Sequence, residues 1–153
     1  MINKDSVSCD ETTIRAPAEL VWEVLLDFAN YGEWNAFCPE IKGEPELGAA
    51  LHMMVDLGNG LQPQVEYVTR LEPCHTIVWS MENKPGDPIH ADRTQRITPV
   101  DDATCIYSSI DEFSGEAVVP MVEALGEQVE KGFNTCATGL KARAEALYRS
   151  RSG

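Results

Sequence analysis

The last third of the chain carries the pattern that most constrains its fold. Apolar residues recur every three or four positions from Val118 to Leu147, the spacing of one face of an α-helix. Pro120 suits a first helical turn, and acidic residues early in the segment and basic residues late in it match the helix dipole. The pattern predicts one helix of roughly thirty residues, about 45 Å long. Its single apolar stripe requires another element to cover it.

The rest of the chain provides that element. Residues 18–28 place apolar side chains on one helical face after Pro17, and the aromatic segment 30–39 fits a short closing helix. Strand-like segments are expected at Val7–Ile14, Leu51–Leu57, Gln64–Leu71, Thr76–Met81, Asp92–Thr98 and Thr104–Phe113. Their short connections favour antiparallel neighbours, because parallel crossovers need a dozen or more residues.

These elements predict one α+β domain spanning residues 1–153, a length usual for a single domain. A sheet with one apolar face can bury that face under one long amphipathic helix. If the sheet is strongly curved, sheet and helix cannot touch everywhere. The expected architecture is therefore a curved antiparallel sheet wrapped around the C-terminal helix, with an internal cavity.

Composition argues against several kinds of partner. The formal net charge of −13 opposes phosphate backbones and anionic headgroups, so we expect no nucleic acid partner. No apolar run reaches the length of a membrane span, and the N-terminus lacks the apolar core of a signal peptide. We therefore expect a soluble, cytoplasmic protein that is a monomer or a homodimer.

The polar residues that usually mark catalysis or metal binding are scattered. The five cysteines are widely spaced and form no C-x-x-C pair, and the three histidines are isolated. Motifs for hydrolysis or phosphoryl transfer are missing from the sequence. We expect reduced cysteines, no metal and no cofactor.

Several segments resemble the START/pollen-allergen-like (SRPBCC) superfamily, of the polyketide cyclase/dehydrase and lipid-transport type. The resemblance covers Val7 to about Leu147. It is carried by Ile14–Trp22, Leu26–Asn35, Ile77–Trp79, Ile97–Pro99 and Glu112–Gly115. It implies the helix-grip fold, in which a curved sheet encloses a long helix and a cavity for a small molecule. Proteins similar to this one include lipid carriers, cyclases and partner-binding regulators, so the resemblance predicts the fold more narrowly than the function.

A cavity of this kind needs apolar walls with a few convergent polar groups. The candidate ligand-binding residues are Trp34, Phe37, Tyr67, Trp79, Met81, Arg93, Tyr107, Asp111 and Phe133. Each aromatic residue could equally be plain core packing. Arg93 either points outward into solvent or inward, where it needs a partner such as Asp111 or an acidic ligand, because an unpaired buried charge is costly.

Three functions remain open at this point. The first is binding of a small hydrophobic or aromatic, lipid- or polyketide-like molecule, as carrier or sensor. The second is a polyketide cyclase or dehydratase, in which the resemblance implies that Arg93 and Tyr107 aid enolisation. The third is a protein-binding regulator, such as an activator of a chaperone ATPase. In each case Gly132, within the long helix, is expected to leave room for a ligand or for the sheet.

Overall fold

Within residues 1–152, which the computed structural model describes, eight strands form one antiparallel sheet. The strands are β1 (Ser6–Ser8), β2 (Thr12–Ile14), β3 (Glu40–Lys42), β4 (Ala50–Asp56), β5 (Leu61–Glu72), β6 (Thr76–Ser80), β7 (His90–Asp101) and β8 (Thr104–Ser114). They lie in the order β1-β8-β7-β6-β5-β4-β3, and β2 also pairs with β8. Three helical segments complete the fold: α1 (Ala18–Leu26), the 3-10 helix η1 (Phe28–Glu33) and α2 (Val118–Ser152). The predicted α+β helix-grip architecture is confirmed.

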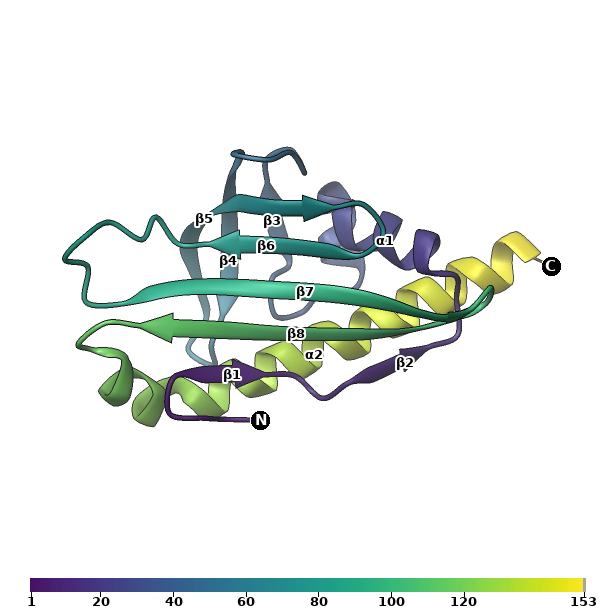
Figure 1. The fold of residues 1–153 in the computed structure, drawn as a ribbon. Helices are drawn as coiled ribbons and strands as arrows, with labels where there is room; N and C mark the ends of the chain where they lie inside the picture. The colour runs from purple at the N-terminus through teal and green to yellow at the C-terminus, as the bar shows by residue number, and fades with distance from the viewer. Residues whose placement is uncertain (153) are drawn as a thin grey trace.

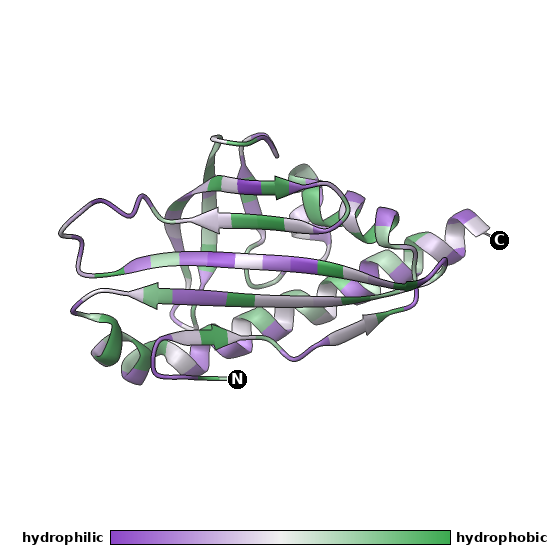
Figure 2. Cartoon of the chain, in the orientation of Figure 1, coloured by the Kyte–Doolittle hydropathy of each residue, from purple (hydrophilic) through white to green (hydrophobic). Residues whose placement is uncertain are grey.

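Helix α2 crosses one face of the sheet along the length of β7 and β8 (Figure 1). It begins at Val118, as predicted, and continues five residues beyond Leu147 to Ser152. Hydrophobic and hydrophilic residues alternate along its ribbon (Figure 2). Val129, Phe133 and Leu140 are among those buried against the sheet. Most of the apolar stripe is thus covered, as its spacing requires, although Leu125 stays exposed.

The predicted strands from β4 to β8 are all present, with ends that differ by up to three residues. The prediction of one continuous strand over Val7–Ile14 is wrong. This segment forms two short strands, β1 and β2, because the chain leaves the sheet edge between them. There the backbone N–H of Asp10 donates to Asn134 Oδ1 on α2, over 2.8 Å. Strand β3 was not predicted, since three residues are too few to show an alternation.

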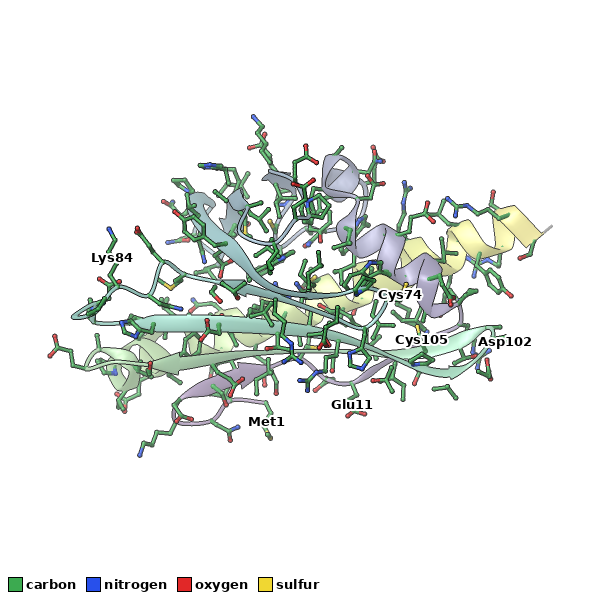
Figure 3. The ribbon with its side chains drawn as sticks, turned by 45° about the horizontal axis from the view of Figure 1, so that its top comes forward. Met1, Glu11, Cys74, Lys84, Asp102 and Cys105 are labelled. Atoms are coloured by element: carbon green, nitrogen blue, oxygen red, sulfur yellow. The ribbon has the colours of Figure 1, made fainter. Side chains whose placement is uncertain are left out.

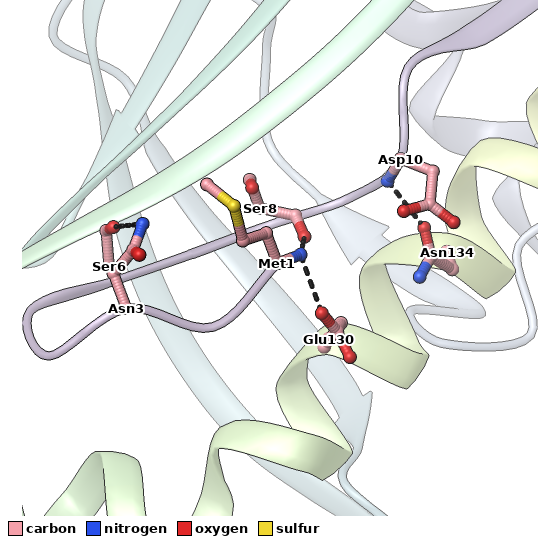
Figure 4. A network of polar contacts seen from close by, with 7 residues as sticks. All are labelled: Met1, Asn3, Ser6, Ser8, Asp10, Glu130 and Asn134. Carbon is pink, nitrogen blue, oxygen red and sulfur yellow. Dashed lines mark hydrogen bonds and ion pairs between the residues drawn. The ribbon is translucent and has the colours of Figure 1, made fainter.

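A set of polar contacts joins the N-terminal segment to α2 (Figure 4). The α-amino group of Met1 lies 2.6 Å from a carboxylate oxygen of Glu130 and also donates to the carbonyl of Ser8. Further along, Asp10 is bonded to Asn134. These contacts lie at the surface, where each ion pair adds little to stability. They fix the position of β1 against the helix.

The segment between α1 and β3 closes one end of the fold. Helix α1 ends at Leu26, two residues before the predicted end, and Pro17 occupies its N-cap position rather than its first turn. Tyr31 of η1 is buried, and its hydroxyl donates to the carbonyl of Leu25. The ring of Phe28 meets that of Trp79 edge-on, with centroids 6.0 Å apart. The aromatic character of this segment therefore serves packing against the sheet.

The cysteines are distributed over several elements. All five are free, and four are buried. Cys74 lies in the turn between β5 and β6, whereas Cys105 is on β8; Figure 3 labels both. The same view shows Lys84 and Asp102 near opposite ends of the sheet.

Candidate ligand cavity

A cavity of about 420 Å³ lies between the sheet and the first half of α2. Its walls are mainly apolar, and the apolar and small residues are Phe37, Met53, Val55, Leu57, Val65, Trp79, Met81, Ile89, Ala91, Phe113, Met121, Leu125, Val129 and Phe133. Cys38, Gln64, Glu66, Arg93 and Asp111 complete the lining. Apolar walls with a few polar groups are typical of small-molecule sites, and the volume lies within the usual range of about 300–1,000 Å³.

Arg93 is the fixed positive charge of this cavity. It lies on β7, alternates inward with the fully buried Gln95 and is only 6% exposed. Its guanidinium carbon lies 4.1 Å from the ring centroid of Phe133 and 5.8 Å from that of Trp79. Stacking against aromatic faces stabilises a cation. The inward alternative for Arg93 is therefore the observed one.

Two of the three nitrogen atoms of the Arg93 guanidinium nevertheless lack hydrogen-bond partners. Its Nε and Nη2 atoms are buried and, among residues 1–152, neither has an acceptor. Asp111 stands directly opposite on β8, yet the described residues show no ion pair between the two within 4.0 Å. Asp111 Oδ1 is likewise buried and unpartnered. Since burying an unsatisfied charged group is costly, the arrangement suits a bound polar group or water.

Glu66 is a second carboxyl of the cavity. It lies on β5, is only 6% exposed, and makes no side-chain hydrogen bond within the described part of the chain. Burial raises the pKa of Glu66 to about 8; the charge of Asp111 adds to this rise and Arg93 opposes it. Burial also raises the pKa of Asp111 to about 7, again against the effect of Arg93. Both carboxyls therefore change between the protonated and the ionised form near neutral pH.

These pKa values predict how stability depends on pH. The folded protein keeps protons on Glu66 and Asp111 at pH values where an unfolded chain, with carboxyl pKa values of about 4, has released them. The contribution of these two carboxyls to the free energy of unfolding therefore falls as the pH rises from about 4 to about 8, and then levels off. Glu66→Gln removes the ionisable group. We expect its stability relative to wild type to be higher at pH 9 than at pH 5 by at least about 1 kcal/mol.

Urea denaturation at the two pH values measures this difference. Glu112→Gln is the matched control, because it removes one carboxylate from the exposed face of β8. It should show a smaller difference between pH 5 and pH 9. Equal effects of the two substitutions would show that Glu66 does not have a raised pKa.

Six of the nine predicted site residues line the cavity. They are Phe37, Trp79, Met81, Arg93, Asp111 and Phe133. The other three predicted residues, Trp34, Tyr67 and Tyr107, are not part of its lining. Tyr67 is half-buried and alternates to the opposite face of β5 from Glu66 and Val68. Trp34 packs on Tyr31, with centroids 4.7 Å apart, and borders a shallow hollow outside α2.

Tyr107 is the third predicted residue that lies outside the cavity lining. It is fully buried on β8, and its hydroxyl donates to Gln95 Oε1 over 2.6 Å. Because the hydroxyl is used within the protein, Tyr107 stabilises the region beneath the cavity. Tyr107→Phe should lower the free energy of unfolding by about 1–2 kcal/mol and leave ligand affinity unchanged. Denaturation and ligand titration of the same sample check both parts; lost affinity with unchanged stability would contradict this placement.

Sequence reasoning missed Glu66 entirely. It lies between Val65 and Tyr67 in a strand whose first five residues are exposed, so its inward direction gives no periodic signal. The structure also identifies the residue for which Gly132 leaves room, which is Phe37. A Cβ atom there would lie 2.2 Å from Cδ1 of Phe37, so this glycine admits the Phe37 ring to the cavity wall.

In residues 1–152, side chains of His, Cys, Asp and Glu do not gather in groups of three or more that could hold a metal ion. No helix in the same range is long and apolar enough to cross a membrane.

Three solved structures with the same architecture show what the fold is similar to. The ZhuI aromatase/cyclase from Streptomyces sp. R1128 is 20% identical, with a TM-score of 0.77 over 97% of this chain and 98% of that one. A START superfamily protein from Mycobacterium smegmatis is 18% identical, with a TM-score of 0.71 over 94% and 99%. A norcoclaurine synthase from Thalictrum flavum is 14% identical, with a TM-score of 0.68 over 100% and 99%. At such identities the likeness shows the fold alone.

Sequence comparison places the chain in a family. No curated protein matches the sequence significantly. The profile of the family described as polyketide cyclase / dehydrase and lipid transport matches residues 7–145. That match covers most of the 153 residues. The chain therefore belongs to the polyketide cyclase / dehydrase and lipid transport family.

Proposed function

We propose that the protein binds a small hydrophobic or aromatic molecule in the cavity, as a carrier or sensor. The observation that carries this proposal is the set of unpartnered polar groups within mainly apolar walls. Arg93 and Asp111 each have buried polar atoms without partners, and both border about 420 Å³ of space. Unsatisfied buried groups are rare in folded proteins. A ligand with an apolar body and a polar group would satisfy them and fill the cavity.

Native mass spectrometry of the purified protein tests the proposal. The expected result is a non-covalent small-molecule adduct that is lost on denaturation. Ala91→Trp is the matched variant, because Ala91 lines the cavity, is 3% exposed and has little volume of its own. The larger side chain should occupy the space and abolish the adduct. An adduct that persists equally in Ala91→Trp would contradict binding in this cavity.

A second function, catalysis on a carbonyl compound, is supported by the pKa values. A carboxyl with a pKa of about 7 or 8 is suited to accept a proton from carbon near neutral pH. Arg93 would then stabilise the charge that develops on the carbonyl oxygen. One of the structural neighbours is an aromatase/cyclase. In an enzyme, Arg93→Gln should reduce turnover much more than affinity, whereas in a carrier only affinity should change.

The third function considered, a protein-binding regulator, was expected to show a filled core with an exposed apolar patch. The open cavity does not favour that alternative.

A further inference from the structure

The cavity contains three groups that carry charge, and their balance is unusual. Arg93 supplies one positive charge, while Glu66 and Asp111 supply two carboxyls. The three side chains come from β7, β5 and β8, respectively. Within residues 1–152 no ion pair within 4.0 Å forms among them. Each therefore remains available to a ligand, although Arg93 and Glu66 are more than nine-tenths buried.

We propose that Glu66 sets the charge preference of the cavity: with Asp111 it offsets Arg93, so the cavity takes an uncharged ligand with a hydroxyl group and disfavours a carboxylate of the same shape. This inference rests on the proposed binding function and specifies its ligand. It assigns to Glu66 a role in specificity.

The argument for an uncharged ligand is electrostatic. Ionised Asp111 already offsets the charge of Arg93, and Glu66 makes the site negative once it is ionised as well, above its pKa of about 8. A ligand carboxylate would add another negative charge within mainly apolar walls, where like charges repel strongly. A hydroxyl group avoids that cost. It can donate to a carboxylate oxygen and accept from the guanidinium, so it satisfies groups of both kinds.

Other groups near Glu66 do not change this balance. The charged or titratable neighbours that act on it are Arg93, Asp111 and Asp92, and the thiol of Cys38 also lies close. Asp92 is on the exposed face of β7 and adds negative charge. The Cys38 thiol, whose pKa burial raises to about 12, stays neutral. Helix α2 contributes Met121, Leu125, Val129 and Phe133 to the lining, none of which is charged.

Isothermal titration with two probes of one shape tests the inference. The probes are 2-naphthol, which is uncharged, and 2-naphthoate, which is anionic. The titrations are run at pH 8.5, above the pKa of Glu66 of about 8. Wild type should bind 2-naphthol at least about tenfold more tightly than 2-naphthoate. Glu66→Gln keeps the size of the side chain but removes its charge, and should reduce this ratio at least about fivefold.

Glu112→Gln, which removes the same charge from the outer face of β8, should leave the ratio at its wild-type value. Equal binding of the two probes by wild type, or an unchanged ratio in Glu66→Gln, would overturn the inference and leave the proposed binding function standing. If wild type binds neither probe, the inference fails together with the proposed binding of aromatic molecules.

Discussion

Replacing Gly139 with alanine should lower the free energy of unfolding by about 3 kcal/mol. A Cβ atom at this position would lie 2.1 Å from the carbonyl oxygen of Trp34. That oxygen belongs to the backbone, so it cannot move aside as a side chain could. Either α2 or the segment after η1 must shift. For a chain of this length the melting temperature should fall by roughly 6–12 °C.

Gly126→Ala is the matched control in the same helix. Its Cβ atom would lie 3.3 Å from the side-chain atom Cγ2 of Ile2, which can adjust. Alanine is better than glycine in a helix by about 1 kcal/mol, so this variant should be as stable as wild type or slightly more stable. Equal melting temperatures of the two variants would contradict the close approach of Trp34 to α2.

Arg93→Met should weaken binding of an uncharged aromatic ligand about 10- to 100-fold, because a charge-assisted hydrogen bond contributes about 1.5–3 kcal/mol. Methionine keeps much of the length of the side chain and its contact with Phe133. At pH 5 the Glu66 and Asp111 carboxyls are protonated, since their pKa values are about 8 and about 7. Loss of the cation then leaves no uncompensated carboxylate, so the fold should survive and binding can be measured by titration with 2-naphthol.

Arg96→Met is the control for this substitution. Arg96 lies on the same strand, β7, but is exposed. It should retain wild-type affinity. If Arg96→Met and Arg93→Met weaken binding equally, the effect arises from the overall charge of the protein and not from the cavity.

The fold was predictable because its strongest signal is local. The stripe from Val118 to Leu147 depends only on helical periodicity, and α2 follows it. The single strand predicted over Val7–Ile14 failed for a non-local reason. A contact between Asp10 and Asn134, which are 124 residues apart, takes the chain away from the sheet. No window of neighbouring residues contains that contact.

The site was predictable where strand alternation holds. Alternation places Arg93, Gln95 and Ile97 on one face of β7, and all three are buried. Alternation does not say how far along the sheet the cavity extends. Tyr107 and Asp111 lie on the same strand, yet only Asp111 reaches the cavity, while Tyr107 bonds to Gln95 beneath it.

The glycines of α2 show that sequence alone does not identify packing partners. Gly132 was predicted to leave room for a ligand or for the sheet, but its position in the sequence did not identify the residue that fills this room. The structure supplies Phe37 for Gly132 and Trp34 for Gly139. Both partners come from the segment that joins η1 to β3, about a hundred residues away. The same segment therefore shapes one wall of the cavity through contacts that only the folded chain reveals.

The methionines provide the most direct test of a ligand in the cavity. Three of the five, Met53, Met81 and Met121, line it, whereas Met1 is 62% exposed and Met54 is not in the lining. In a titration of methyl-labelled protein with 2-naphthol, NMR signals of the three lining methyl groups should shift together and saturate. The signals of Met1 and Met54 should stay in place. Shifts confined to Met1 and Met54, or no shift at any methionine, would contradict binding of an uncharged aromatic molecule in this cavity.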